Sequence, residues 1–350
     1  MMNETPKQLG YYFPAEWTPH EATWLTWPYR DDSFPNVLEE VYPSYCSFIS
    51  YISRGEKVRI LVPTEQEALR AREMIQLAKA NVSSIEFFVY PTNDVWCRDH
   101  GPAFLLHRTG EKPKIIVDWE FNAWGDKYPS QLDNGVPSFI AQQLELQTFR
   151  PGIVMEGGSV EFNGAGTLLT TEACLLNPNR NPHLSQAQIE EYLREYYGVE
   201  QILWLGDGIV GDDTDGHMDD ICRFVNHDTV IAAVEYNTGD DNYLPLQDNL
   251  KRLKTFRLPN GRQPHIIELP MPKPVVYRGD RLPASYANFY ICNSGVMVPI
   301  FRCKEDNTAL KIIEQAFPER TIYDIDCSRI VVGLGTLHCL SQQEPLVNPN

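Results

Sequence analysis

The chain has 350 residues, of which 43% are hydrophobic, and its 47 acidic residues outnumber its 30 lysines and arginines, giving a formal net charge of −17. Enough apolar surface is present for a sizeable core, which excludes a disordered chain. The negative charge disfavours nucleic acid and anionic membranes as partners and attracts small cations, although acidic surfaces also serve solubility alone.

The N-terminal sequence, Met-Met-Asn-Glu-Thr-Pro-Lys-Gln, lacks the basic-then-apolar pattern of a signal peptide, and no apolar run reaches the roughly 20 residues that span a bilayer. We therefore expect a cytoplasmic protein. The cysteines, at positions 46, 97, 174, 222, 292, 303, 327 and 339, show no CxxC spacing. In a reducing compartment they are expected to be free thiols, not a disulfide framework or a zinc cluster.

In chain order, short apolar runs rich in branched side chains predict strands at residues 58–62, 85–90, 115–119, 167–170, 202–205, 229–234, 266–269, 296–300 and 322–325. Helical patterns lie between them at residues 65–80, 185–197 and 309–316, and the second opens with a Ser-Gln-Ala-Gln capping box. This alternation predicts an α/β fold. Because no low-complexity linker divides the sequence, we expect a single domain over residues 1–350.

A weaker regularity overlies these elements. Five segments each join small, acidic or amide residues to a strand-like run: residues 93–104, 156–162, 211–224, 288–299 and 333–343. Their uneven spacing does not establish a repeat. The pattern fits several similar units around a common centre, each contributing one polar tip.

The first two of these segments offer groups that suit a cationic ligand. Trp96 has a flat face for a cation or an alkyl chain, and Asp99 can pair with a guanidinium. The structural alternative is a local ion pair between Arg98 and Asp99 in a turn. Glu156, followed by two glycines that let backbone approach closely, either orients a histidine or caps a turn.

The third segment places His217 two residues before Asp219. If residues 217–224 form a strand, both side chains project from the same face. A histidine beside a carboxylate is equipped for proton transfer. The alternative is an Asp-rich turn with one satisfied histidine, and the spacing does not match the Ca²⁺ loop of an EF-hand.

The last segment carries Cys339 in Gly-Leu-Gly-Thr-Leu-His-Cys-Leu-Ser-Gln-Gln, close to the end of the chain. Buried cysteines usually lie in apolar strands or helices, where they act as small hydrophobes. Here glycines precede the thiol and amides follow it, so we predict a loop that presents a nucleophile at a pocket.

No metal or cofactor is expected. Four residues of these segments have side chains that can bind zinc: His217, Asp219, His338 and Cys339. The chain has no HxxxH, HExxH or CxxC spacing, however, and such spacings are typical of zinc sites. No P-loop sequence is present, which argues against phosphate chemistry of that kind.

Together, in this order, the segments resemble the agmatine deiminase and bacterial-type peptidylarginine deiminase family of the guanidine-modifying superfamily. The resemblance runs nearly end to end, from Ala-Thr-Trp-Leu-Thr-Trp-Pro at 22–28 through Trp-Cys-Arg-Asp-His-Gly-Pro at 96–102 and Glu-Gly-Gly at 156–158. It continues through Thr-Glu-Ala-Cys-Leu-Leu-Asn-Pro-Asn-Arg-Asn at 171–181, Thr-Asp-Gly-His-Met-Asp at 214–219 and Leu-His-Cys-Leu-Ser-Gln-Gln at 337–343. Two departures are Asp215, where close agmatine deiminases usually carry Asn, and the sequence ahead of His338, where they carry a glycine run.

The resemblance implies a five-bladed α/β propeller with pseudo-fivefold symmetry, and oligomers are common in the family. It also implies the site: Cys339 as nucleophile, Asp99 and Asp219 gripping a guanidinium, and His217, oriented by Glu156, transferring protons. The implied reaction forms a covalent thiouronium, releases ammonia and needs no cofactor or metal.

The expected function is therefore conversion of agmatine to N-carbamoylputrescine and ammonia, a step toward putrescine, with Trp96 among the substrate contacts. Three alternatives remain at this point. They are deimination of arginine within proteins, deimination of free arginine, which needs a cation for the α-carboxylate, and a polyamine-binding protein without catalysis.

Overall fold

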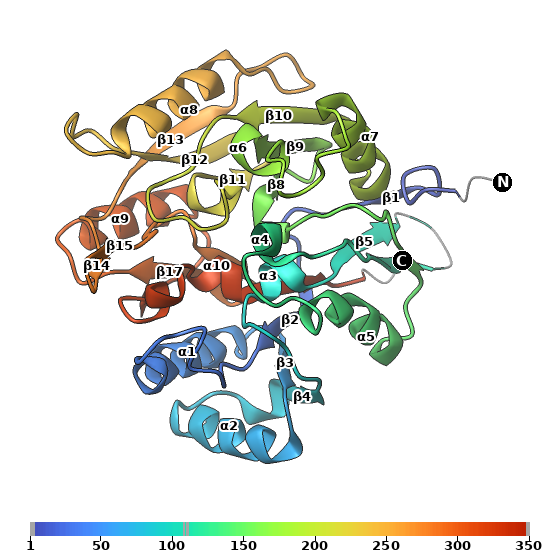
Figure 1. The fold of residues 1–350 in the computed structure, drawn as a ribbon, viewed down its shortest axis with the longest axis vertical. Coiled ribbons are helices and arrows are strands. Elements are labelled where there is room, and N and C mark those ends of the chain that lie inside the picture. The colour runs from blue at the N-terminus through green and yellow to red at the C-terminus, as the bar shows by residue number, and fades with distance from the viewer. Residues whose placement is uncertain (1–3, 108, 110–111, 348–350) are drawn as a thin grey trace.

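A computed structural model describes residues 4–107, 109 and 112–347. The chain forms an α/β fold in which helices lie toward the periphery and the short turns α3, α4 and α10 lie near the middle (Figure 1). The predicted α/β class is thus confirmed. The predicted domain limits, residues 1 and 350, lie outside the described residues. No helix of the described part has both the length and the apolar character needed to cross a membrane.

Five of the sheets share one topology: an antiparallel pair of strands, followed across a helix by a parallel strand. The antiparallel pairs are β19 with β2 (Ser341–Pro345, His20–Thr26), β5 with β6 (Ala103–His107, Lys114–Val117), β8 with β9 (Val160–Phe162, Thr167–Thr171), β11 with β12 (Cys222–Asn226, Thr229–Val234) and β16 with β17 (Tyr290–Cys292, Gly295–Ile300). The parallel strands that follow are β3 (Lys57–Val62), β7 (Thr148–Phe149), β10 (Gln201–Leu205), β13 (His265–Pro270) and β18 (Ile322–Asp326).

Three further features complete the sheets. Strand β4 (Ile85–Val89) extends the first sheet beyond β3, and β1 (Tyr11–Tyr12) borders β5. A separate hairpin joins β14 (Val276–Tyr277) to β15 (Asp280–Arg281). In the first sheet the last strand of the chain, β19, pairs with β2, so residues near the two ends of the chain share one sheet.

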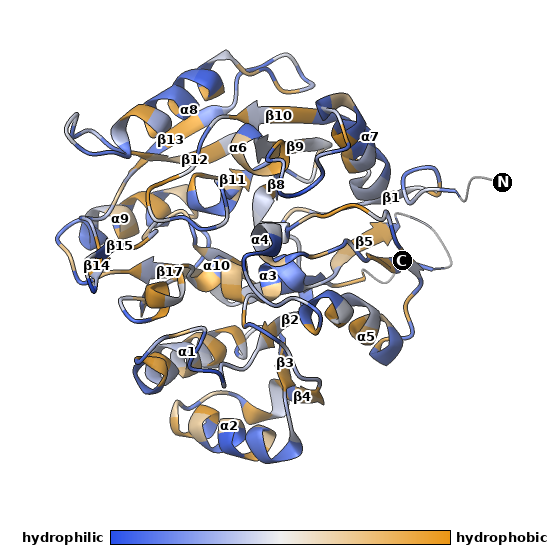
Figure 2. Cartoon of the chain, viewed as in Figure 1, coloured by the Kyte–Doolittle hydropathy of each residue, from blue (hydrophilic) through white to orange (hydrophobic). Residues whose placement is uncertain are grey.

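The crossover helices obey the rule that parallel neighbours need a long connection. They are α1 (Leu38–Ile52), α5 (Val136–Gln143), α7 (Gln186–Tyr197), α8 (Tyr243–Thr255) and α9 (Asp306–Ala316), with α2 (Glu65–Leu77) leading to β4. Helix α7 begins with the predicted capping box between Ser185 and Gln188 and ends at Gly198, whose φ of 68° is left-handed. In Figure 2 the outer helices carry both hydrophilic and hydrophobic residues, whereas the central turn α3 is hydrophilic.

The predicted strands and helices are present, with ends displaced by a few residues. Sequence reasoning did not predict β2, α1, α5 or α8. Helices α1 and α8 contain Pro43 and Pro245, which weaken a helical signal. Pro245 lies in the first turn of α8, where its missing N–H has no intrahelical partner to lose.

In each of the five polar-tipped segments, the polar residues precede the first strand of a sheet. Four of the tips are single turns: α3 (Cys97–His100) before β5, Gly157–Ser159 before β8, Met218–Asp220 before β11, and α10 (Leu337–Leu340) before β19. The fifth tip contains Asn288, just before β16. These tips meet in the middle of the molecule, as the distances in the next subsection establish.

Candidate active site

Cys339 lies in the helical turn α10, so the prediction of a loop at this residue is wrong. The turn forms because Asn288 organises it: the side-chain oxygen of Asn288 accepts hydrogen bonds from the Thr336 hydroxyl (2.8 Å) and the His338 backbone N–H (3.0 Å). The amide nitrogen of Asn288 lies 3.0 Å from Cys339 Sγ. The thiol is thus held by a neighbouring sheet.

Asp219 lies beside Cys339, and His217 lies beside Asp219, although not for the predicted reason. Residues 218–220 form a 3₁₀ turn and the strand begins only at Cys222, so the prediction of a strand from residue 217 is wrong. The turn still directs both side chains to the centre. Asp219 Oδ2 lies 3.4 Å from Cys339 Sγ, and Asp219 Oδ1 lies 4.0 Å from His217 Nδ1.

Glu156 holds the other side of the His217 ring. Glu156 Oε2 lies 3.4 Å from His217 Nε2, and Glu156 Oε1 accepts a hydrogen bond of 2.6 Å from Arg180 Nε. Burial opposes the charge on Glu156, but His217 and Arg180 lower the pKa of its carboxyl below the usual range. The two ring nitrogens of His217 thus face different carboxylates: Nε2 faces Glu156, and Nδ1 faces Asp219 and Asp99.

Asp99 completes the group from α3. Its Oδ1 accepts a hydrogen bond from the Gly158 backbone N–H and its Oδ2 one from the Trp124 ring N–H, both 2.9 Å long. Asp99 Oδ1 also lies 3.7 Å from His217 Nδ1. Burial, with repulsion from Asp219 and Glu156, raises the pKa of the Asp99 carboxyl to about 6. Arg98 is bonded to other residues, so the alternative of a local Arg98–Asp99 pair fails.

The electrostatics of the site favour a neutral thiol and a charged imidazole. Burial, and then the nearby carboxylates, chiefly that of Asp219, raise the pKa of the Cys339 thiol well above its usual value. Burial disfavours the imidazolium form of His217, but Asp99, Cys174 and Glu156 outweigh it and raise the His217 pKa well above its usual value. The carboxylates thus stabilise any cation at this centre.

A pocket with an empty volume of about 310 Å³ leads from the surface to the thiol. Its walls are largely aromatic and glycine-rich, comprising Trp96, Asp99, Trp124, Tyr128, Asp213, Thr214, Gly333, Leu334, Gly335 and Cys339. Trp96 is buried against the glycines: a Cβ on Gly335 would lie 2.7 Å from its ring. Trp96 thus forms one wall of the pocket.

Another part of the pocket wall, at Trp124, comes from a strained turn. In α4 (Ala123–Asp126) four successive residues have positive φ, among them Trp124 at 58°. A non-glycine residue in this region costs roughly 1–3 kcal/mol. The turn is fixed by Asn122, whose side chain accepts a hydrogen bond from the Gly125 N–H at 2.9 Å and donates one of 2.9 Å to the Asn179 carbonyl. This backbone conformation directs the Trp124 ring N–H to Asp99, to which it donates a hydrogen bond.

Close packing at Gly158 gives the first prediction. A Cβ at this position would lie 2.5 Å from His217 Nδ1 and 2.9 Å from Asp99 Oδ1. We expect Gly158→Ala to displace the imidazole and lower kcat/KM roughly 10²-fold, because displacements near 1 Å suffice for such losses. Overpacking should also cost about 1–3 kcal/mol of stability. Steady-state kinetics measure the change in kcat/KM, and thermal unfolding measures the change in stability.

The control for this prediction is Gly239→Ala, whose Cβ would meet only Asn237 Oδ1 at 3.5 Å and which should change neither kcat/KM nor stability. Unchanged kinetics in Gly158→Ala would contradict the assigned packing.

Among the described residues, one group could hold a metal ion: Glu156, Cys174 and His217, with ligand atoms within 4.8 Å of one another. The Arg180 guanidinium already pairs with Glu156 at 2.6 Å, and a second cation beside it would be repelled. The donor set therefore favours the ion pair. All eight cysteines, which fall within the described residues, are free thiols.

Several residues of the site were missed in the sequence. Asn288 was within a predicted polar tip, and Cys174 and Arg180 were within a motif of the resemblance, but no role was assigned to them. Trp124 carried no signal, because its position depends on a left-handed turn that propensity disfavours.

Comparisons with known proteins agree with this geometry. The model of the Porphyromonas-type peptidyl-arginine deiminase family matches residues 12–345. An agmatine deiminase from Pseudomonas aeruginosa is 37% identical over 366 residues, covering 97% of each chain. The structure of Enterococcus faecalis agmatine deiminase has a TM-score of 0.91 and 32% identity, covering 99% of this chain and 98% of that one.

A second solved structure is similar too. A Cys-to-Ser variant of C. jejuni agmatine deiminase, with substrate bound, has a TM-score of 0.86 and 34% identity, covering 95% of this chain and 96% of that one. A family match that spans nearly the whole chain, together with relatives of this similarity, establishes the relationship. The chain belongs to the Porphyromonas-type peptidyl-arginine deiminase family.

Proposed function

We propose that this chain is an agmatine deiminase, which converts agmatine and water to N-carbamoylputrescine and ammonia. One observation carries the proposal: two buried polar atoms that lie 4.0 Å apart, His217 Nδ1 and Asp219 Oδ1, have no hydrogen-bond partner among the described residues, and the Asp219 carboxylate contacts the Cys339 thiol. Buried polar atoms are normally paired, and two unpaired atoms among the carboxylates around a pocket thiol support a ligand-binding place there. The names of the relatives point to agmatine as that ligand.

A guanidinium fits this arrangement. It is a planar cation with N–H groups in a fixed fork, and carboxylates are its natural partners. Asp99 and Asp219 supply the carboxylates, and one oxygen of each lies near His217 Nδ1, at 3.7 and 4.0 Å. A cation held between them would face the Cys339 sulfur, 3.4 Å from Asp219.

The proposed reaction has two balanced halves. In the first, a bond forms between Cys339 Sγ and the guanidinium carbon, and a C–N bond breaks. The thiol proton is released to solvent as the cationic substrate binds, and the imidazolium of His217 donates its proton to the departing nitrogen, so that ammonia leaves, a thiouronium cation remains and His217 becomes neutral. In the second, water adds to the same carbon, the C–S bond breaks, the thiol is re-formed with one proton from water, and the other proton passes to His217. Bringing the cation against Asp99 and Asp219 neutralises the carboxylates that keep the thiol protonated.

The pocket mouth supports an amine-ended substrate. Among the described residues, no lysine or arginine lines the pocket, so nothing there would pair with the α-carboxylate of free arginine. Asp213 lies on the wall, where the Tyr128 hydroxyl donates to its Oδ2 at 2.7 Å. Its side chain is 35% exposed and its Oδ1 also lies 3.5 Å from Lys127 Nζ, which pairs in addition with Asp215, so the distal ammonium of agmatine would share Asp213 with Lys127. Trp96 and Trp124 would flank the four-carbon chain.

A substrate panel tests the proposal. Purified protein should release ammonia from agmatine with a kcat/KM at least 10²-fold above that for free arginine or a blocked arginine peptide. Asp213→Asn should raise the KM for agmatine roughly tenfold and change kcat much less, because an interaction with a spectator ammonium contributes mainly to binding. Asp241→Asn, at an exposed aspartate outside the pocket, is the matched control.

The panel also decides the second candidate, protein-arginine deimination, which the name of the matching family favours. Turnover confined to the blocked peptide would overturn the agmatine assignment and support that candidate. Equal kcat/KM values for Asp213→Asn and Asp241→Asn would show that Asp213 does not contact the substrate.

We also propose the architecture and setting that go with this activity. The shared topology of five sheets, with a polar tip before each first strand, supports a five-bladed propeller forming one domain. Eight free thiols suit the cytoplasm, where the product would feed putrescine synthesis. The reaction as written uses no cofactor or metal, and the oligomeric state is left to measurement.

A further inference from the structure

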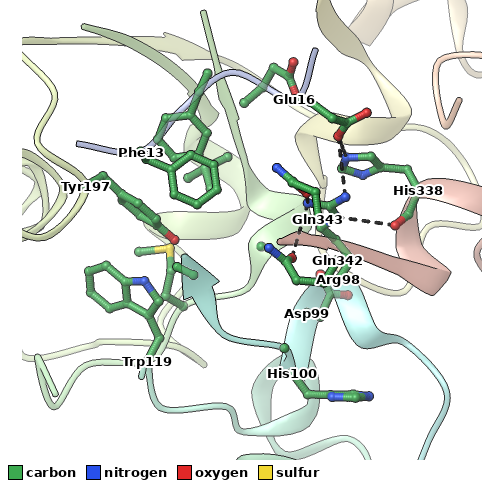
Figure 3. Close-up of a pocket in the computed structure, with 17 residues that line it drawn as sticks. Phe13, Glu16, Arg98, Asp99, His100, Trp119, Tyr197, His338, Gln342 and Gln343 are labelled. Atoms are coloured by element: carbon green, nitrogen blue, oxygen red, sulfur yellow. Dashed lines mark hydrogen bonds and ion pairs between the residues drawn. The ribbon is translucent and has the colours of Figure 1, made fainter. Parts of the chain in front are cut away.

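A second cavity, with an empty volume of about 570 Å³, lies behind the proposed reaction centre, and Asp99 lines both it and the substrate pocket. Figure 3 shows this cavity, with Phe13, Trp119 and Tyr197 on one side and Glu16, Arg98 and His338 on the other. The charged side is a network of buried groups. The mechanism above assigns no role to Glu16 or His338.

His338 links this network to the substrate carboxylate. Its Nδ1 lies 2.7 Å from Asp219 Oδ2, and its Nε2 lies 2.8 Å from Glu16 Oε2. All three side chains are buried. A histidine ring donates hydrogen bonds at both nitrogens only when it is doubly protonated, and each of these nitrogens faces a carboxylate oxygen.

Glu16 is in turn firmly held. Its Oε2 pairs with Arg223 at 3.0 Å and with Arg98 at 3.5 Å, and its Oε1 accepts a hydrogen bond of 2.8 Å from the Ile291 backbone N–H. Burial opposes its charge, but Arg223 and His338 lower the pKa of the Glu16 carboxyl well below its usual range. A fixed charge of this kind can set the position of the imidazole ring.

The consequence falls on Asp219. With His338 on Oδ2, the oxygen left free is Oδ1, which has no partner among the described residues and lies toward His217 Nδ1. We propose that His338, anchored by Glu16, is a positioning residue that fixes the rotation of the Asp219 carboxylate and presents Oδ1 to the guanidinium. This inference rests on the proposed deimination of a guanidinium substrate.

Without His338, two forces would move the carboxylate. The terminal torsion of aspartate is broad and roughly twofold, so a carboxylate that loses its partner is free to rotate. Asp219 also lies near the like charge of Asp99, because both carboxylates are close enough to act on the same thiol. His338 and, more weakly, His217 and Arg223 stabilise the charge on Asp219 against this repulsion, and they lower its pKa despite burial.

Two substitutions at one position separate the contacts of the ring. In His338→Asn the amide nitrogen can occupy the place of Nδ1 and still donate to Asp219, but the contact with Glu16 is lost. In His338→Gln the amide can reach Glu16, but the donor to Asp219 is lost. The backbone bonds of residue 338, from its N–H to Asn288 and from Arg98 to its carbonyl, survive both changes.

The experiment measures binding and turnover of both variants. In a Cys339→Ser background, where turnover is blocked, calorimetry should show that His338→Gln weakens agmatine binding about 10- to 100-fold, the usual effect of losing a hydrogen bond to a charged group. His338→Asn should stay within about threefold of the parent. N-carbamoylputrescine, whose head group is neutral, should lose no more than about threefold in either variant. When the same substitutions are made in the enzyme that retains Cys339, kcat/KM for agmatine should fall more in His338→Gln than in His338→Asn.

The outcomes are distinct. Equal losses in the Asn and Gln variants, or equal losses for the charged substrate and the neutral product, would show that His338 only supports the fold and would overturn the inference. Thermal unfolding identifies a variant that fails to fold, and Glu16→Gln then provides the second test, with an intermediate loss of agmatine binding expected. Failure of the unmodified enzyme to act on agmatine would instead count against the proposed function.

Discussion

Cys339→Ala is expected to abolish agmatine turnover, lowering kcat by a factor on the order of 10⁴ or more, because among the described residues Cys339 is the one thiol that lines the substrate pocket. Agmatine should still bind, since Asp99 and Asp219 remain in place. Ammonia release measures the first effect and calorimetry the second. Mass spectrometry of the unmodified enzyme, quenched during turnover, should show a covalent adduct confined to the peptide that contains Cys339.

The charge of the site also predicts how the Cys339 thiol reacts with neutral and with cationic alkylating reagents. Because neighbouring carboxylates keep the Cys339 thiol protonated, neutral iodoacetamide should alkylate it slowly, whereas a cationic haloacetamidine should react quickly by occupying the place of the guanidinium. Cys303, a half-buried thiol outside both cavities, provides the comparison, and Cys303→Ala should retain turnover. Normal turnover in Cys339→Ala would remove the covalent mechanism.

The sequence was most informative where the intrinsic preference of the residues matched the structure that they form. Strands at residues 167–170 and 229–234 were predicted from branched apolar runs and appear as β9 and β12. The five polar tips were recognised as a weak regularity, and they do meet: Cys339 contacts Asn288 and Asp219, and His217 lies near Asp99, Glu156 and Asp219. Their shared topology could not be derived from uneven spacing alone.

The sequence was least informative where a role depends on tertiary contact. Glu16 lies 322 positions from His338 along the chain, and nothing near Glu16 in sequence indicates its partner. His217 and Asp219 come together through a 3₁₀ turn, so the correct pairing was predicted from an incorrect strand. Trp124 reaches Asp99 from a backbone conformation that its own residue type disfavours, which is typical of functional sites.

Asp99→Asn should lower kcat/KM for agmatine by a factor on the order of 10²–10⁴, which corresponds to breaking one partner of a buried ion pair. The pH dependence gives the sharper test. Since the pKa of Asp99 is raised to about 6, kcat/KM of the parent enzyme should fall as the pH drops below that value, because a protonated Asp99 cannot pair with a guanidinium. The Asn variant should lack this acid limb. A limb of unchanged position in Asp99→Asn would assign it to another group.

The same substitution should separate activity from stability. A carboxyl whose pKa rises from 3.8 to about 6 on folding binds its proton more tightly in the folded state, so its contribution to stability falls as the pH rises through that interval. Two units amount to roughly 3 kcal/mol. Against this, Asn leaves the Gly158 N–H or the Trp124 ring N–H without an acceptor, at about 1–3 kcal/mol. We therefore expect Asp99→Asn to be less stable than the parent at pH 4 and to gain relative stability by pH 7, which denaturant unfolding at the two pH values measures. A difference in unfolding free energy between Asp99→Asn and the parent that stays constant with pH would show that the folded enzyme does not destabilise the charge on Asp99.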